Sequence, residues 1–234
     1  DRRDPLSPET TGRWVAETVW PSPDIERRGY RLIPGALVPD DGGSTGGELS
    51  IKSPLSVGLF AGKWCSYAET TDLPSDQRLE DGGALVFDTA PLAGDISILG
   101  APELELELAA DRPVAMVAAR LSDIGLDDRA TRVTFGVLNL THRDGHTQPQ
   151  PLEPGRRYRV RVPLNDIGQR FFAGHRIRLA ISSSYFPLAW PSPEPARLTL
   201  YVAGCQLQLP VRTPKPEDAT LRDLGGPLTA PAPP

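Results

Sequence analysis

The sequence has no long apolar run, no excess of basic charge and very little cysteine. No apolar stretch approaches the roughly 18 residues that a membrane-spanning helix needs, so we expect no membrane contact. The formal net charge is −5, from 25 basic and 30 acidic residues among 234. Nucleic-acid-binding domains usually carry a basic patch, so we expect no nucleic-acid partner.

Only two cysteines are present, Cys65 and Cys205, and they lie far apart without a CxxC motif. Their spacing does not establish a disulfide, and two buried thiols are the favoured interpretation. Such thiols are compatible with a reducing compartment, so we expect a cytoplasmic bacterial protein.

The chain begins without a signal peptide and also without Met, so we expect a fragment of a longer polypeptide.

Proline and glycine are abundant, at 26 and 22 residues of the 234, which is about a fifth of the chain. Because proline breaks helix interiors and central strands, this content predicts many loops and short elements. Long helical bundles and coiled coils are excluded. The length fits a single domain that is large enough to bury a core without disulfides or a metal.

Short strand patterns separated by turn residues predict an all-β fold. Residues 103–108 (ELELEL) alternate strictly, so the leucines should face a core and the glutamates should meet water or basic partners. Residues 114–121 are continuously apolar, as in a central strand, and 166–173 could hold one helical turn. Further strands are predicted at 28–33, 48–52, 84–88, 95–99, 132–141, 157–162, 176–182, 197–202 and 206–211. Such a series is typical of a β-sandwich or barrel.

The chain divides into three segments by composition. Residues 1–27 are expected to form a linker and an entering strand, 28–212 the sandwich, and 213–234 a Pro-rich, flexible tail. Within the sandwich, residues 53–83 form a long connection with little periodicity. Long connections inside compact domains are usually functional or interfacial.

Several segments together resemble one protein family. They are 84–92 (ALVFDTAPL), 116–143, 173–187 (AGHRIRLAISSSYFP) and 188–212, and their order along the chain is family-like. They are similar to the C-terminal domain of cocaine-esterase-like hydrolases, a module that X-prolyl dipeptidyl peptidases and glutaryl or cephalosporin acylases also carry. Phe135 departs from the pattern, because many relatives have a small acidic residue there.

The resemblance implies a jelly-roll β-sandwich, similar to galactose-binding domains. It also implies the non-catalytic part of a larger enzyme, whose serine, aspartate and histidine would lie in an α/β-hydrolase domain upstream. That catalytic domain, on the same polypeptide, is the partner that the resemblance implies. This chain alone is then expected to be inactive, and its sequence does not indicate an oligomeric state.

A GxSxG motif does occur at 42–46, with Ser44 at its centre. The motif supports nucleophilic catalysis only where a buried strand precedes it and a helix follows, because that turn exposes the serine hydroxyl beside an oxyanion site. Here a Pro-Asp-Asp sequence precedes it and a short strand pattern follows. Ser44 is therefore interpreted as a turn residue, and no catalytic residue is predicted.

The three histidines and a group of aspartates are the residue types that could bind a metal ion. His142 and His146 flank Asp144 at a predicted hairpin tip and could chelate a metal, but a solvent-facing turn without supporting groups is the favoured interpretation. His175 is interpreted as a hydrogen-bonded residue at the start of a strand. The aspartates within 123–128 could hold calcium, but an ordinary charged hairpin is favoured. No metal site and no cofactor are predicted.

Five large aromatic residues lie in loop-like segments of the sequence. They are Trp64, Tyr67, Tyr185, Phe186 and Trp190. Such residues can fold into the core, contact another domain or stack on a ligand. Given the resemblance, we predict that they line the interface with the hydrolase domain or the rim of its substrate cleft. Two further tryptophans, at positions 14 and 20, are expected to pack on the sandwich or to bridge the two domains.

The predicted function is that of a non-catalytic C-terminal domain of an α/β-hydrolase-type serine hydrolase, of the acyl esterase, amidase or X-prolyl dipeptidyl peptidase class. It would stabilise the catalytic domain and border its substrate cleft. The alternative is a stand-alone carbohydrate-binding jelly-roll module, which would stack aromatic side chains on sugar rings. A structural sandwich of the coat or adhesin type is a third possibility, although the sequence shows no repeats.

Overall fold

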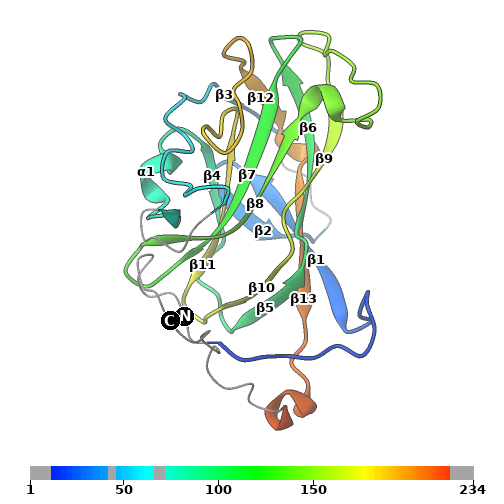
Figure 1. Cartoon of the computed structure of the whole chain (residues 1–234). Helices are drawn as coiled ribbons and strands as arrows, with labels where there is room; N and C mark the ends of the chain where they lie inside the picture. The colour runs from blue at the N-terminus through cyan, green and yellow to red at the C-terminus, as the bar shows by residue number, and fades with distance from the viewer. Residues whose placement is uncertain (1–11, 42–45, 66–71, 222–234) are drawn as a thin grey trace, which may run out of the picture.

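The computed structural model describes residues 12–41, 46–65 and 72–221 (Figure 1). These residues form the expected all-β sandwich, with thirteen strands. The strands are β1 (Ile25–Ile33), β2 (Ala36–Pro39), β3 (Glu48–Ile51), β4 (Leu85–Asp88), β5 (Ile96–Gly100), β6 (Glu103–Ala110), β7 (Met116–Ile124), β8 (Ala130–Asn139), β9 (Tyr158–Pro163), β10 (Ile167–Phe171), β11 (Arg176–Ser182), β12 (Leu198–Tyr201) and β13 (Gln206–Arg212). The likeness to galactose-binding domains stays a prediction.

Helical structure is sparse, as expected from the proline content. In the part of the chain that the structure describes, it comprises one α-helical turn, α1 (Arg78–Asp81), and the 3-10 turns η2 (Leu140–His142), η3 (Val202–Gly204) and η4 (Pro216–Thr220). Among the described residues, none of these helices has the length and apolar character to cross a bilayer.

The strands fold over into two layers with the main core between them. In the first layer, β11 lies between β4 and β7, and β8 follows β7, all antiparallel. In the second layer, β6 pairs with β9, β12 and β13, and β13 pairs with β1. One parallel pairing, Ala36 with Asp88, connects β2 to β4. The core contains Leu121 and Leu179 from the first layer and Leu104 from the second.

The alternation in ELELEL is confirmed and explains one outer face of the sandwich. Leu104, Leu106 and Leu108 of β6 are buried in the core. The intervening glutamates face outward beside the arginines of β9, where Arg161 Nε lies 3.2 Å from Glu103 Oε1. The predicted basic partners of the acidic face are therefore supplied by the neighbouring strand.

Two local predictions differ from the structure. The helical turn suggested at 166–173 is wrong, because Ile167–Phe171 forms β10 and pairs antiparallel with β5. Ile167 and Phe171 both pack on the core, which fits a period of two. The four-residue strand β2 was not predicted, since its pattern is too short to stand out after the turn at Gly35.

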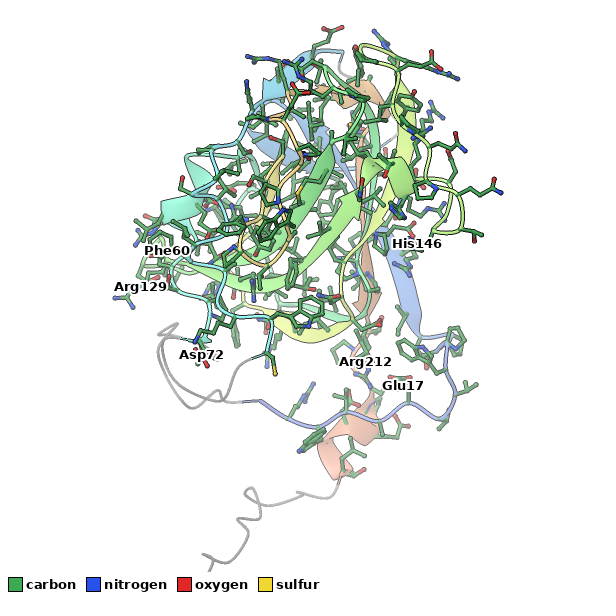
Figure 2. All side chains as sticks on the ribbon, turned by 45° about the horizontal axis from the view of Figure 1, so that its top comes forward. Glu17, Phe60, Asp72, Arg129, His146 and Arg212 are labelled. Atoms are coloured by element: carbon green, nitrogen blue, oxygen red, sulfur yellow. The ribbon has the colours of Figure 1, made fainter. Side chains whose placement is uncertain are left out.

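The segment before β1 and the segment after β13 meet at Arg212, and Glu17 and Arg212 point toward each other (Figure 2). Arg212 Nε donates to Glu17 Oε1 at 2.6 Å, and its two terminal nitrogens donate to the carboxylate of Asp218 at 2.7 Å each. Lys215 Nζ donates to Glu17 Oε2 at 2.7 Å. Lys215, Ser22 and Arg212 lower the pKa of Glu17 to about 2, and Arg212 lowers the pKa of Asp218.

The segment predicted as a flexible tail therefore starts with an ordered turn. Residues 216–220 form η4, and Asp218 within it is buried. The prediction of an extended segment is wrong at these residues. Asp218 of η4 is held by Arg212 on β13, and Arg212 also binds Glu17 in the N-terminal segment. These are tertiary contacts, which the Pro-rich composition does not indicate. The domain boundaries themselves stay a prediction, and residues 222–234 lie outside the described part of the chain.

Candidate interdomain surface

The outer face of the first layer is covered by chain segments that lie between strands in the sequence. We call the described residues of these segments the covering layer: its first part is 53–65 with 72–83, and its second part is 183–190. Figure 1 shows the stretch before α1 (cyan) beside α1 and β4. A second apolar cluster joins Val57 and Tyr185 of the covering layer to Met116 and Ala118 of β7. Strand β7 is therefore buried on both faces, as its continuous apolar sequence predicted.

A fully buried arginine holds the covering layer on the sheet. The side chain of Arg120, on β7, has no exposed surface. Its Nη1 donates to Gln77 Oε1 at 3.1 Å and to Glu80 Oε2 at 3.0 Å, and its Nη2 donates to Asp81 Oδ1 at 3.1 Å. Burial raises the pKa of Glu80, an effect that the charge of Arg120 opposes. A charge in such a place is tolerated only because it is paired and hydrogen-bonded.

The same polar groups reach the backbone of the loop before α1. Glu80 Oε1 accepts a hydrogen bond from the amide of Phe60 at 2.6 Å, and Gln77 Nε2 donates to the carbonyl of Phe60 at 2.9 Å. Arg132 Nη1, from β8, donates to the carbonyl of Ala61 at 2.6 Å and to Tyr185 Oη at 2.9 Å. The loop around residue 60 is thus fastened to two strands.

The two parts of the covering layer also contact each other directly. The amide of Ser53 donates to Ser183 Oγ at 2.9 Å, and the amide of Ser183 donates to Ser53 Oγ at 3.0 Å. Gly58 has φ +118°, and a Cβ there would lie 2.2 Å from the carbonyl oxygen of Phe186. Only glycine permits this approach, so segments about 130 residues apart in sequence form one packed unit.

This packed layer nevertheless presents several large apolar side chains to solvent. We call them the apolar rim: Leu55, Leu59, Phe60, Trp64, Leu79 and Trp190. The ring of Trp190 contacts the ring of Phe186, with centroids 6.0 Å apart. Among the described residues, no exposed large hydrophobic side chain lies on β6, β9, β12 or β13. A concentration of apolar groups on one face is typical of an interaction surface.

The structure separates the five aromatic residues predicted for this surface. Trp64 is 79% exposed and Trp190 is 85% exposed, so both belong to the apolar rim. Phe186 is half-buried against Trp190. Tyr185 is fully buried, which corrects its predicted place on the rim: its ring packs beneath the covering layer, where Arg132 satisfies its hydroxyl. Tyr67 lies outside the described residues.

Four members of the apolar rim were not predicted from the sequence: Leu55, Leu59, Phe60 and Leu79. The signal available was a set of apolar residues in the aperiodic connection 53–83. That signal does not separate exposed from buried positions, because Val57 and Ala61 of the same loop are buried. Trp14 and Trp20 are also exposed, and the ring of Trp20 lies beside Gly100.

The histidine and aspartate predictions can be followed in the structure. His175 Nδ1 lies 2.9 Å from Asp123 Oδ1, as expected for a hydrogen-bonded residue at the start of a strand. Desolvation raises the pKa of Asp123. Asp128, in the predicted charged hairpin between β7 and β8, pairs with Arg176 at the start of the neighbouring strand β11. Ser44 lies outside the described residues.

The prediction of two buried thiols is half wrong. Cys205 is buried, and burial raises its pKa to about 11. Cys65 is exposed, at a loop position and not on a strand. Both are free cysteines, so the structure joins them by no disulfide.

Comparisons with known proteins agree with this architecture. Residues 5–215 match the family described as the X-Pro dipeptidyl-peptidase C-terminal non-catalytic domain. The chain is 26% identical over 186 residues to the cocaine esterase of Rhodococcus sp. (strain MB1 Bresler), a match that covers 74% of this chain and 32% of that protein. The chain thus spans about a third of the length of this curated relative.

Two solved structures share the fold. An aminopeptidase from a marine sediment archaeon, Thaumarchaeota archaeon, superposes with a TM-score of 0.72 at 18% identity, over 86% of this chain and 39% of that one. A CocE/NonD family hydrolase from Staphylococcus aureus superposes with a TM-score of 0.66 at 13% identity, over 86% and 39%. The carbohydrate-binding alternative gains no support from these matches. The family match covers most of the sequence, and the chain belongs to the family of X-Pro dipeptidyl-peptidase C-terminal non-catalytic domains.

Proposed function

We propose that this domain docks through the apolar rim on a catalytic α/β-hydrolase domain of the same polypeptide. The parent protein would be a serine hydrolase that acts on esters, amides or peptides, and this chain alone would be inactive. The observation that carries the proposal is the concentration of exposed leucine, phenylalanine and tryptophan side chains on one packed layer of a non-catalytic domain.

The energetics favour this rim as the contact. Burying one large apolar side chain contributes about 1.5–3 kcal/mol, and tryptophan is enriched among the residues that dominate interface energies. Trp64 and Trp190 each still expose most of their surface, so most of that gain is available to a partner. The buried contacts of Arg120 and Arg132 hold the loop backbone in place, which lowers the entropy lost on docking.

A rim of this kind would also border a substrate cleft. Large aromatic side chains on well-anchored loops can restrict access to a neighbouring pocket without taking part in the chemistry. In this role, Trp64 of the rim and Phe186, which contacts Trp190, would shape access of the acyl group, and the reacting residues would all lie in the hydrolase domain.

The first step of the test is to sequence the gene upstream of the codon for Asp1. We expect an in-frame α/β-hydrolase domain with its own strand–GxSxG–helix segment. The full-length protein and the 234-residue chain are then compared by amide hydrogen exchange. Docking predicts stronger protection of residues 55–64 and 186–190 in the full-length protein.

Substitutions in the apolar rim test whether it makes the contact with the hydrolase domain. In the full-length protein, Trp64→Ala combined with Trp190→Ala should lower the melting temperature and the thermal stability of hydrolysis. The same substitutions in the 234-residue chain should change its unfolding free energy by at most about 0.5 kcal/mol per site, because both side chains are exposed. Arg159→Ala, at a side chain that is equally exposed (85%) on the other face, serves as the matched control.

Two results would contradict the proposal. One is a gene with no hydrolase domain in frame. The other is a full-length protein in which the tryptophan pair and Arg159→Ala have the same small effect on stability and leave protection of the rim unchanged.

A further inference from the structure

A short turn after β8 brings two histidines together. The side chain of Asn139 accepts hydrogen bonds from the amide of Thr141 at 3.1 Å and from its hydroxyl at 2.9 Å. The amide of Gly145 donates to the carbonyl of His142 at 3.0 Å. Arg143 Nη1 donates to the carbonyls of Leu140 at 3.1 Å and of Gln150 at 2.7 Å. The backbone that carries the two rings is therefore well braced.

Within this turn, Nδ1 of His142 lies 3.1 Å from Nδ1 of His146. The ring centroids are 5.2 Å apart and the ring planes are inclined by 43°. His142 is half-buried and His146 is exposed. With metal–nitrogen bonds of about 2.0–2.1 Å, two imidazoles on one tetrahedral or square-planar ion have nitrogens about 2.9–3.4 Å apart. The observed separation falls in this range without any change in the distance between the two nitrogens.

We propose that His142 and His146 form a two-histidine chelate for a divalent transition-metal ion such as Zn²⁺, Ni²⁺ or Cu²⁺. Neutral imidazole suits these ions, whereas Ca²⁺ and Mg²⁺ prefer oxygen ligands. The described residues contain no group of three or more histidine, cysteine, aspartate or glutamate side chains that could hold a metal, so water would fill the other positions. The intervening Asp144 is engaged by Arg143 Nε at 3.2 Å.

The sequence analysis favours a solvent-facing turn without supporting groups at these histidines. The proposed chelate differs from that interpretation because of the distance between the two rings. A spacing of four residues does not determine whether two rings meet, but the capped and cross-braced turn brings the two Nδ1 atoms to hydrogen-bond distance, where a metal ion would replace the shared proton. In Figure 2, His146 lies on the opposite side of the molecule from Phe60 of the apolar rim. The chelate therefore neither depends on nor tests the proposed interdomain contact.

The test uses the tag-free 234-residue chain, freed of metal and titrated calorimetrically with Zn²⁺, Ni²⁺ and Cu²⁺ salts. We expect saturable one-to-one binding of at least one ion. His142→Gln and His146→Gln should each weaken it at least tenfold, because a chelate that loses one ligand becomes a single imidazole. His175→Gln is the matched control, since that ring is held by Asp123, and its affinity should stay within twofold of the parent chain.

Long-range ¹H–¹⁵N spectra of the imidazole rings give a second measurement that does not depend on variants. On addition of Zn²⁺, the Nδ1 signals of His142 and His146 should shift. The chemical shifts of their Nε2 signals should remain those of a protonated ring nitrogen. Absence of one-to-one binding for all three ions overturns the proposal. Binding that persists in both His142→Gln and His146→Gln, or spectra that show Nε2 as the bound atom, also overturns it.

Discussion

The two outer faces of the sandwich both carry arginines, but the environments of these side chains are opposite. On the first layer, Arg120 and Arg132 lie beneath the covering layer and hold its loops. On the second layer, Arg157, Arg159 and Arg161 lie open to solvent beside the glutamates of β6. The outer face of the first layer is thus covered by loops that present apolar side chains. The outer face of the second layer carries a row of exposed arginines beside a row of glutamates.

The difference shows how the same residue type supports two kinds of surface. Exposed ion pairs contribute little to stability, but they keep a sheet face soluble without any cover. A buried arginine needs several acceptors, and those acceptors here belong to the segment that forms the cover. The covering layer is therefore held by these polar contacts together with the small apolar cluster around Tyr185, and its exposed leucine and tryptophan side chains stay available to a partner.

The largest expected contrast between the faces comes from removing one arginine from each. Arg120→Met should lower the free energy of unfolding by about 3–5 kcal/mol, because the buried Glu80 loses its ion-pair partner and Asp81 keeps only Arg178. Arg159→Met should change it by at most about 1 kcal/mol, because that side chain is exposed and 3.9 Å from Glu107. Urea unfolding of the 234-residue chain measures both. Equal losses would show that the covered face is not held by Arg120.

A smaller contrast tests how closely the two parts of the covering layer are packed. Gly58→Ala should cost about 2–4 kcal/mol, because φ is +118° and the new Cβ would meet the backbone of Phe186. Gly35→Ala also has a positive φ, +77°, but nothing lies within 4 Å of its Cβ position, so only about 1 kcal/mol is expected. Thermal unfolding of both variants gives the comparison. A Gly58→Ala loss no larger than that of Gly35→Ala would show that residues 53–62 do not pack tightly on 183–187.

The smallest expected effect concerns the ion cluster at the chain ends, which belongs to neither face. Lys215, Ser22 and Arg212 hold the pKa of Glu17 at about 2, below its ordinary value of 4.5. Its stabilising contribution is therefore present above pH 4.5 and is lost as the pH falls toward 2. Glu17→Gln should flatten the dependence of stability on pH between 5 and 2, as measured by urea unfolding at each pH. An unchanged slope would mean that Glu17 does not contribute to acid unfolding.

The strands of the sandwich could be predicted well where their pattern is local. Residues 103–108 alternate so strictly that both the buried leucines and the outward glutamates followed from sequence. The secondary structure of residues 166–173 could not be predicted from their own pattern. The short sequence around Gly168 is compatible with a helical turn or a strand, and it forms β10 because it pairs with β5. The resemblance of segments such as 173–187 to one family was also predicted from the sequence, and the family match confirms it.

The candidate surface was predicted only in outline. Aromatic residues in loops pointed to 185–190, but Tyr185 is buried while Trp190, five positions later, is almost fully exposed. Nothing local separates the two. Tyr185 is buried because Arg132 satisfies its hydroxyl and the loop around Val57 and Ala61 covers its ring.

By itself, then, the sequence determined the all-β class, most of the strands and the family, because side-chain period, turn residues and motif order are properties of neighbouring positions. Tertiary structure alone decided which charges and rings are covered. The partners of Arg120 lie about 40 residues away, and those of Ser53 lie 130 residues away. Burial depends on what the folded chain places above a side chain, and contacts between such distant segments leave no periodic signal in the sequence.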